Sequence, residues 1–220
     1  MGNESEYFNK VYDKFWSVQS RRYGYAPYEQ NLVRLIAKSN PGKVFEVGIG
    51  TGWPIGTALK EKGIVVDGCD LAESSVMSAR KELGNEEGIW VGDVMSYMGS
   101  EQWDTIYCVR ASWYIPDFYD TLLKMISMTK SRGYLVFDVM DENSPCCLKI
   151  RWSALKEKYY RFLGIHVNEV YGRHFINISK MKKFLKKNGL DYQCWSERKI
   201  TGNKDWRNTP KVVFLCRKEN

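Results

Sequence analysis

The chain has 220 residues, of which 44% are hydrophobic and 27% charged, and it carries a net charge of +7 at pH 7. This length fits one domain with a full hydrophobic core. The sequence shows no secretory signal and no apolar run long enough to span a bilayer, so we expect a cytoplasmic protein without a membrane partner.

The cysteines and histidines argue against a metal centre. Six cysteines are scattered without a C-x-x-C pair and only two histidines are present, so no zinc site can be built at the usual spacings. Cys69, Cys108 and Cys216 lie in apolar runs, where a free thiol behaves as a small core residue. We therefore expect no metal.

Two helices are predicted at the start of the chain. Aromatic and aliphatic residues recur at helical spacing over residues 5–20, which predicts an amphipathic helix with an aromatic face. A second helix is predicted over residues 27–38, and Asn40-Pro41-Gly42 ends it.

Residues 44–56 combine a buried strand, a glycine turn and the start of a helix. The glycines at 48, 50 and 52 allow positive φ and let a ligand approach the backbone closely. Pro54 is predicted at the first helical position, where proline loses no hydrogen bond. The stretch therefore presents free backbone N–H groups at a helix N-terminus to a bound ligand.

The elements that follow alternate between strands and helices. Strands are predicted over residues 64–70, 89–91, 103–109 and 134–139, and helices over 53–62, 74–83 and 117–130. Either Ser74 or Ser75 is expected to cap its helix. The alternation predicts an α/β domain with a parallel sheet.

The C-terminal part has another pattern. Residues 141–177 have no clean period, and we assign them loosely as helix and lid. The next helix is predicted to have an apolar inner face and a solvated face of five lysines, Lys180, Lys182, Lys183, Lys186 and Lys187, although a nucleic-acid patch stays open. Strands over 192–200 and 212–216 are predicted to form an antiparallel hairpin.

In an open α/β sheet, ligands bind at the carboxyl ends of the strands. Asp70 ends the second strand about twenty residues after the glycine turn, where a carboxylate can accept hydrogen bonds from both ribose hydroxyls. Asp93, Arg110 and Asp138 stand at the ends of the third, fourth and fifth strands.

Several motifs resemble those of the class I S-adenosylmethionine-dependent methyltransferases. The matching segments are Glu46-Val47-Gly48-Ile49-Gly50-Thr51-Gly52, Gly68-Cys69-Asp70-Leu71-Ala72-Glu73-Ser74, Gly92-Asp93-Val94, Trp103-Asp104-Thr105-Ile106-Tyr107 and Gly133-Tyr134-Leu135-Val136-Phe137. The alternating glycines differ from the G-x-G-x-x-G of a nicotinamide-binding fold.

The resemblance implies a Rossmann-like, seven-stranded and mostly parallel sheet with an antiparallel C-terminal hairpin, helices on both faces and an N-terminal helical cap. We expect one methyltransferase domain over 1–220, with the cap over 1–40 and a substrate lid over 141–177. A monomer or a homodimer is expected.

The resemblance also implies S-adenosyl-L-methionine as the cofactor. Gly48 and Gly50 would pass beneath its methionine part, with Glu46 helping to order the amino group. Asp70 would hold the ribose, and Leu71 would pack on the adenine.

Five more positions complete the implied site. Asp93 would accept a hydrogen bond from the adenine amino group, with the Val94 backbone nearby, and Arg110 would offer its main-chain carbonyl to the methionine end. Tyr12 is predicted to approach the sulfonium, with Trp16 second.

Methyl transfer from a sulfonium mainly requires alignment and exclusion of water, but a hydroxyl acceptor usually needs a base. The candidate bases are His174, His166, Tyr114 and Asp138, and the residues predicted to act in catalysis are His174, Tyr114 and Tyr12.

We expect a small-molecule acceptor with a nitrogen or oxygen nucleophile. Arg110-Ala111-Ser112-Trp113 departs from the Asn/Asp-Pro-Pro-aromatic motif of enzymes that methylate nucleobase or glutamine amino groups. Pro145-Cys146 follows the fifth strand rather than the fourth, which argues against a cytosine C5 enzyme. The alternatives are a nucleic-acid or protein methyltransferase that uses the basic surface, and a non-catalytic binding module.

Overall fold

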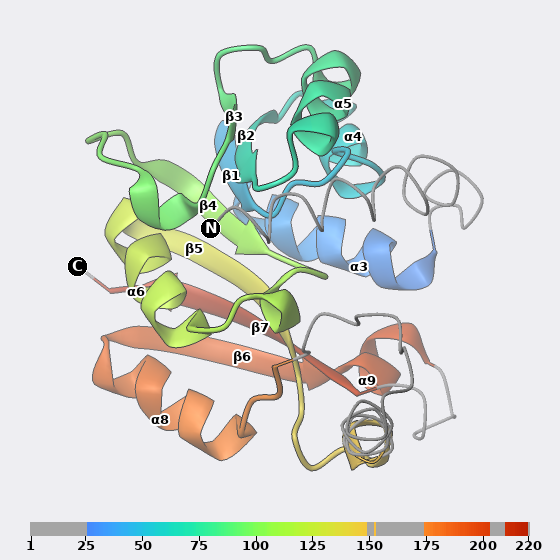
Figure 1. Ribbon diagram of the computed structural model, residues 1–220. Helices are drawn as coiled ribbons and strands as arrows, with labels where there is room; N and C mark the ends of the chain where they lie inside the picture. Colours follow the sequence, from blue (N-terminus) through green and yellow to red (C-terminus); the bar gives the residue numbers. More distant parts are fainter. Residues whose placement is uncertain (1–25, 149–151, 153–173, 203–209, 220) are drawn as a thin grey trace, which may run out of the picture.

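The computed structural model describes residues 26–148, 152, 174–202 and 210–219, and Figure 1 shows them as one sheet covered by helices. The strands are β1 (Lys43–Val47), β2 (Val65–Asp70), β3 (Ile89–Val91), β4 (Trp103–Cys108), β5 (Thr129–Met140), β6 (Leu190–Ser196) and β7 (Lys211–Lys218). The α-helices are α3 (Pro27–Ile36), α4 (Ile55–Lys60), α5 (Glu73–Leu83), α6 (Phe118–Met128), α8 (Ile178–Lys187) and α9 (Glu197–Thr201). Three 3₁₀ turns, Ala37–Ser39, Val94–Ser96 and Ser112–Tyr114, lie between them.

The seven strands have the order β3-β2-β1-β4-β5-β7-β6. The first five are parallel, whereas β7 runs antiparallel to both β5 and β6. The predicted fold, including the C-terminal hairpin, is therefore confirmed. Because β1 pairs with β2 on one side and β4 on the other, the strand order reverses there and a crevice opens at the carboxyl ends of these strands.

A hydrophobic core fills each face of the sheet. Leu32, Ile36 and Leu59 place α3 and α4 in one cluster, which also includes residues of α5. Leu122 and Met181 place α6 and α8 in the other. Both faces are thus covered by helices, as predicted.

Several element boundaries differ from the predicted ones. Helix α5 begins at Glu73 with Ala72 as its N-cap, so Ser74 and Ser75 lie inside the helix. The reason is that Asp70 Oδ1 accepts a hydrogen bond from Ala72 N at 2.9 Å, which closes the turn two residues earlier. Pro54 precedes α4, which begins at Ile55.

The predicted strand over 192–200 is also too long. The structure ends β6 at Ser196, whose Oγ accepts a hydrogen bond from Lys199 N and so caps α9. An apolar residue beyond this point, Ile200, is thereby carried on a helix that packs toward α3.

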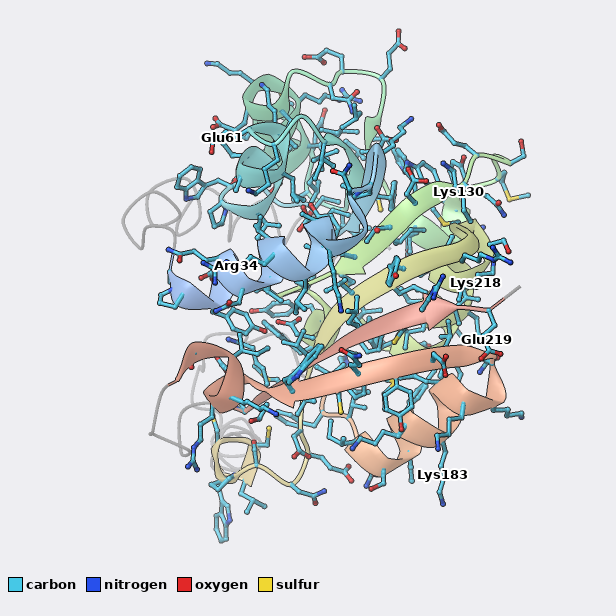
Figure 2. All side chains as sticks on the ribbon, turned by 180° about the vertical axis from the view of Figure 1, so that it is seen from behind. Arg34, Glu61, Lys130, Lys183, Lys218 and Glu219 are labelled. Atoms are coloured by element: carbon cyan, nitrogen blue, oxygen red, sulfur yellow. The ribbon has the colours of Figure 1, made fainter. Side chains whose placement is uncertain are left out.

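The lysine-rich helix α8 has the predicted two faces. Met181 and Leu185 are fully buried against the sheet, and Figure 2 shows Lys183 projecting away from it.

In the described parts of the chain, no helix has the length and apolar character that crossing a membrane requires. Cys69, Cys108 and Cys216 are buried, as predicted.

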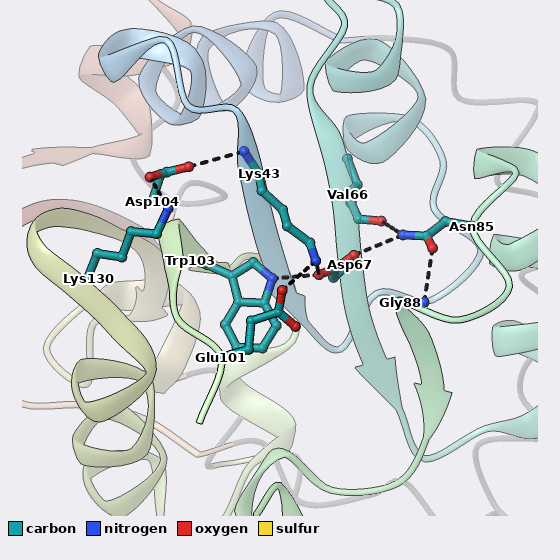
Figure 3. A network of polar contacts seen from close by, with 9 residues as sticks. All are labelled: Lys43, Val66, Asp67, Asn85, Gly88, Glu101, Trp103, Asp104 and Lys130. Carbon is teal, nitrogen blue, oxygen red and sulfur yellow. Dashed lines mark hydrogen bonds and ion pairs between the residues drawn. The ribbon is translucent and has the colours of Figure 1, made fainter. Parts of the chain in front are cut away.

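A buried carboxylate connects β2 to its neighbours at the end of the sheet opposite the crevice. Asp67 is 2% exposed and accepts hydrogen bonds from Trp103 Nε1 at 2.6 Å and from Asn85 Nδ2 at 2.9 Å (Figure 3). Lys43 Nζ lies 2.9 Å from the same carboxylate and 2.7 Å from Glu101. The charge of Asp67 is therefore compensated by three donors.

We expect Asp67→Ala to lower the free energy of unfolding by about 3 kcal/mol, because it leaves buried donors without an acceptor. Asp104→Ala is the control, since it removes a partly exposed ion pair with Lys130 at 2.7 Å and one hydrogen bond from Lys43 N at 3.2 Å, and it should cost about 1 kcal/mol (Figure 3). Urea denaturation followed by circular dichroism measures both. Equal losses would contradict this interpretation of the network.

Candidate functional site

A cavity of about 260 Å³ lies at the carboxyl ends of β1, β2, β3 and β4. Every described residue predicted to bind the cofactor lines it: Glu46, Gly48, Gly50, Asp70, Leu71, Asp93, Val94 and Arg110. Residues as far apart in the chain as Glu46 and Arg110 thus meet at one place. Tyr12 and Trp16 lie outside the described residues.

The glycine turn after β1 forms one wall of this cavity. Gly48, Gly50 and Gly52 all have positive φ, at 75°, 55° and 75°. A β-carbon on Gly48 would lie 2.7 Å from Ala111 Cβ, so the turn packs directly against the segment that follows β4. A β-carbon on Gly50 would meet no atom of the described residues within 4 Å, so among these residues that side of the turn is open.

Asp70 connects the end of β2 to this turn. Its Oδ2 accepts a hydrogen bond from Gly50 N at 2.9 Å, and its Oδ1 accepts one from Ala72 N at 2.9 Å. Burial raises the pKa of Asp70 above its usual range, and the backbone hydrogen bonds partly offset this. Asp70 thus orders the glycine turn as well as lining the cavity.

Two further carboxyl groups reach the cavity in different environments. Asp93 is exposed, and its Oδ1 accepts a hydrogen bond from Met95 N at 2.9 Å. Glu46 is buried and accepts a hydrogen bond from Tyr107 OH at 2.8 Å. Burial raises the pKa of Glu46 well above its usual range, and the hydrogen bond from Tyr107 partly offsets this.

Arg110, at the end of β4, is held by contacts that the sequence analysis missed. Its backbone N donates to Asp138 Oδ1 at 2.8 Å, and its Nη1 donates to Glu29 Oε1 at 2.9 Å. Tyr28 OH donates to Asp138 Oδ2 at 2.6 Å. Sequence offered only one signal for this cluster, the position of Asp138 at a strand end.

Of the three predicted bases that the structure describes, Tyr114, His174 and Asp138, one lines the cavity. Tyr114 lines the cavity. His174 donates its backbone N–H to Trp113 O at 2.8 Å and is not among the described residues that line the cavity. Asp138 is fully buried behind Arg110 with both carboxylate oxygens hydrogen-bonded, so it is not placed to act as a base. His166 and Tyr12 lie outside the described residues.

Other residues line the cavity without having been predicted to bind the cofactor. Trp53, which is 36% exposed, lines the cavity beside the glycine turn, and Ile115 and Pro116 line it after β4. The sequence feature that could have indicated Trp53 as a cavity residue is its position as an aromatic residue directly after the glycines.

Comparisons with known proteins match part of the chain to a methyltransferase domain. Residues 45–137 match the model of a methyltransferase domain. The YqeM protein of Bacillus subtilis is 30% identical over 138 residues, a match that covers 59% of this chain but only 55% of YqeM. The ubiquinone biosynthesis O-methyltransferase of Bordetella avium is 26% identical over 200 residues, covering 86% of this chain and 80% of that protein.

Among solved structures, the magnesium protoporphyrin IX methyltransferase of Synechocystis PCC 6803 with bound SAH has a similar fold. Its TM-score is 0.69 at 15% sequence identity, and the match covers 99% of both chains.

Proposed function

We propose that the chain is a class I S-adenosylmethionine-dependent methyltransferase, which transfers a methyl group from S-adenosylmethionine to a small-molecule acceptor with a nitrogen or oxygen nucleophile. The observation that carries this proposal is the convergence of Asp70, Asp93 and the glycine turn on one cavity. Two acidic side chains and an open glycine face fit an adenosine and its ribose.

We assign the adenosine half of the donor to the ends of β2 and β3. Asp70 would accept hydrogen bonds from the ribose hydroxyls, and Leu71 would pack on the adenine. Asp93 would accept from the adenine amino group, with the buried Val94 beside it.

The methionine half belongs by this assignment to the turns after β1 and β4. Gly48 and Gly50 would let it lie against the backbone, and Arg110 would offer its main-chain carbonyl. Glu46 is buried and hydrogen-bonded to Tyr107, so it would order the part of the cavity wall that lies beneath the methionine half.

When bound, the donor supplies a methyl group whose bond to a positively charged sulfur breaks as the acceptor's lone pair attacks, leaving a neutral thioether. The protein's part is to align the acceptor and exclude water. Tyr114 lines the cavity and is the described side chain that we propose to orient the acceptor. The role of His174 remains a prediction, as does that of Tyr12.

A small-molecule acceptor fits better than a polymer bound by the lysines. Helix α8 packs against β6 at one edge of the sheet, whereas the cavity lies at the ends of β1 to β4 (Figure 1). Strands β5 and β7 therefore lie between the strand that α8 packs on and the strands whose ends form the cavity. The names of related proteins agree, because ubiquinone biosynthesis and magnesium protoporphyrin IX denote small-molecule chemistry.

Isothermal titration calorimetry with S-adenosylhomocysteine tests the proposal. We expect a one-to-one complex with a dissociation constant well below about 1 mM, and no heat of binding from NAD. Absence of binding at S-adenosylhomocysteine concentrations up to about 1 mM would contradict the proposed function. Mass spectrometry of acceptor panels with bound donor then identifies the product by its added methyl group.

A further inference from the structure

Arg110 has a backbone conformation that its side chain does not favour. Its φ is 63°, in the left-handed region where residues with a β-carbon are disfavoured. Such conformations persist only where the surroundings enforce them, and they cluster at functional sites. Arg110 lines the cavity, so the feature that enforces its conformation also shapes the site.

Two acidic residues hold Arg110 from opposite sides. Asp138 on β5 accepts the hydrogen bond from its backbone N at 2.8 Å, and Glu29 on α3 accepts the one from its Nη1 at 2.9 Å. Asp138 is itself fixed by Tyr28 OH at 2.6 Å. Both the backbone and the side chain of Arg110 are therefore tied to the scaffold.

The Glu29 contact carries a cost that stability alone does not explain. Glu29 is 7% exposed, and its Oε2 is buried with no hydrogen-bond partner among the residues that the structure describes. Buried polar atoms are nearly always satisfied, and an unsatisfied one on a charged group is destabilising. Retaining a carboxylate in this position fits a role in holding Arg110.

A shift of Arg110 would reach the glycine turn directly. The next residue, Ala111, packs closely against Gly48. A β-carbon added to Gly48 would lie 2.7 Å from Ala111 Cβ. The conformation at Arg110 thus sets the width of the cavity between the turns after β1 and β4.

We propose that Glu29 and Asp138 are positioning residues for the methyl donor, which hold Arg110 so that the turn after β4 faces the donor's methionine end. The inference rests on the proposed function and deepens it. It concerns only the amino-acid half of the donor. The hydrogen bonds that fix Glu29 and Asp138 join them to Arg110 and Tyr28, and not to the ends of β2 or β3.

The test compares two ligands by calorimetry. S-adenosylhomocysteine has the amino-acid half, and 5′-methylthioadenosine lacks it. Glu29→Gln and Asp138→Asn should each weaken S-adenosylhomocysteine binding about tenfold but change 5′-methylthioadenosine binding by less than about twofold. Asp67→Asn is the matched control, a buried acid paired with Lys43 at 2.9 Å at the end of the sheet opposite the cavity, and should change neither affinity.

A double-mutant cycle tests the route through Arg110. Arg110→Gly removes the guanidinium that Glu29 holds, and glycine adopts the left-handed conformation without strain. In this background Glu29→Gln should therefore have no further effect on S-adenosylhomocysteine binding.

Equal losses for both ligands, unchanged binding in a folded Glu29→Gln variant, or full additivity with Arg110→Gly would overturn the inference. If Asp138→Asn does not fold, Glu29→Gln decides. Failure of the parent protein to bind either ligand would instead contradict the proposed function.

Discussion

Asp70→Ala is expected to weaken S-adenosylhomocysteine binding about 100-fold. The ribose offers two hydroxyl donors, and hydrogen bonds to a charged acceptor contribute about 1.5 kcal/mol or more each, so about 3 kcal/mol is lost. The carboxylate also holds Gly50 N at 2.9 Å, so its loss should loosen the turn beside the ligand. Calorimetry at constant pH and salt measures the change.

An analogue of S-adenosylhomocysteine without the two ribose hydroxyls separates these causes. If Asp70 holds the ribose, Asp70→Ala should change the affinity for this analogue far less than that for the complete ligand. If the two ligands lost affinity equally, the effect would come from the turn alone and the assigned role would be wrong.

The pH dependence of binding should follow the same carboxylate. Burial raises the pKa of Asp70, so its ionised form, which accepts hydrogen bonds best, is lost earlier as the pH falls than in a free aspartate. Affinity should therefore be constant above this pKa and decline as the pH drops through it. The decline should be smaller in Asp70→Ala, measured in the same buffers.

Gly50→Ala should be the second most damaging change, with about a tenfold or greater loss of affinity for S-adenosylhomocysteine. Its φ of 55° is unfavourable for alanine, which should cost about 1 kcal/mol of stability. The added methyl group would meet no protein atom within 4 Å, so we expect it to occupy the space where the ligand lies against the turn.

Gly63→Ala is the matched control. Gly63 also has positive φ, at 77°, and open space around a β-carbon, but it lies in the exposed turn between α4 and β2. Both variants should lose similar stability in thermal denaturation, and only Gly50→Ala should lose affinity. Matching affinity losses would show that strain, not contact with the ligand, causes the effect.

The fold and the cavity could be predicted from sequence because both depend on local patterns. Asp70 and Asp93 follow apolar strands, and the carboxyl ends of parallel strands meet at one edge whatever the packing beneath them. The glycine turn required positive φ at 48, 50 and 52, which glycine adopts most readily.

The contacts around Arg110 could not be predicted, because they join residues far apart in sequence. Tyr28 and Asp138 are separated by 110 positions, and no periodic pattern indicates that one would donate to the other. Asp138 was interpreted as a candidate base from its place at a strand end. Its burial and its two donors, known only from packing, indicate instead that it holds the backbone.

The predicted start of α5 was wrong for a related reason. Ser74 and Ser75 are good capping residues, but the Asp70 carboxylate at the end of β2 closes the turn earlier and places both serines inside α5. Local preference was overridden by a side chain from the preceding strand.

A crystal structure with bound S-adenosylhomocysteine tests the cofactor site most directly. We predict the ribose hydroxyls within hydrogen-bond distance of the Asp70 carboxylate, the adenine near Leu71 and Asp93, and the amino-acid end at the turn after β4 next to Arg110. Ligand bound elsewhere, or bound in this cavity without contact to Asp70, would contradict the assignment.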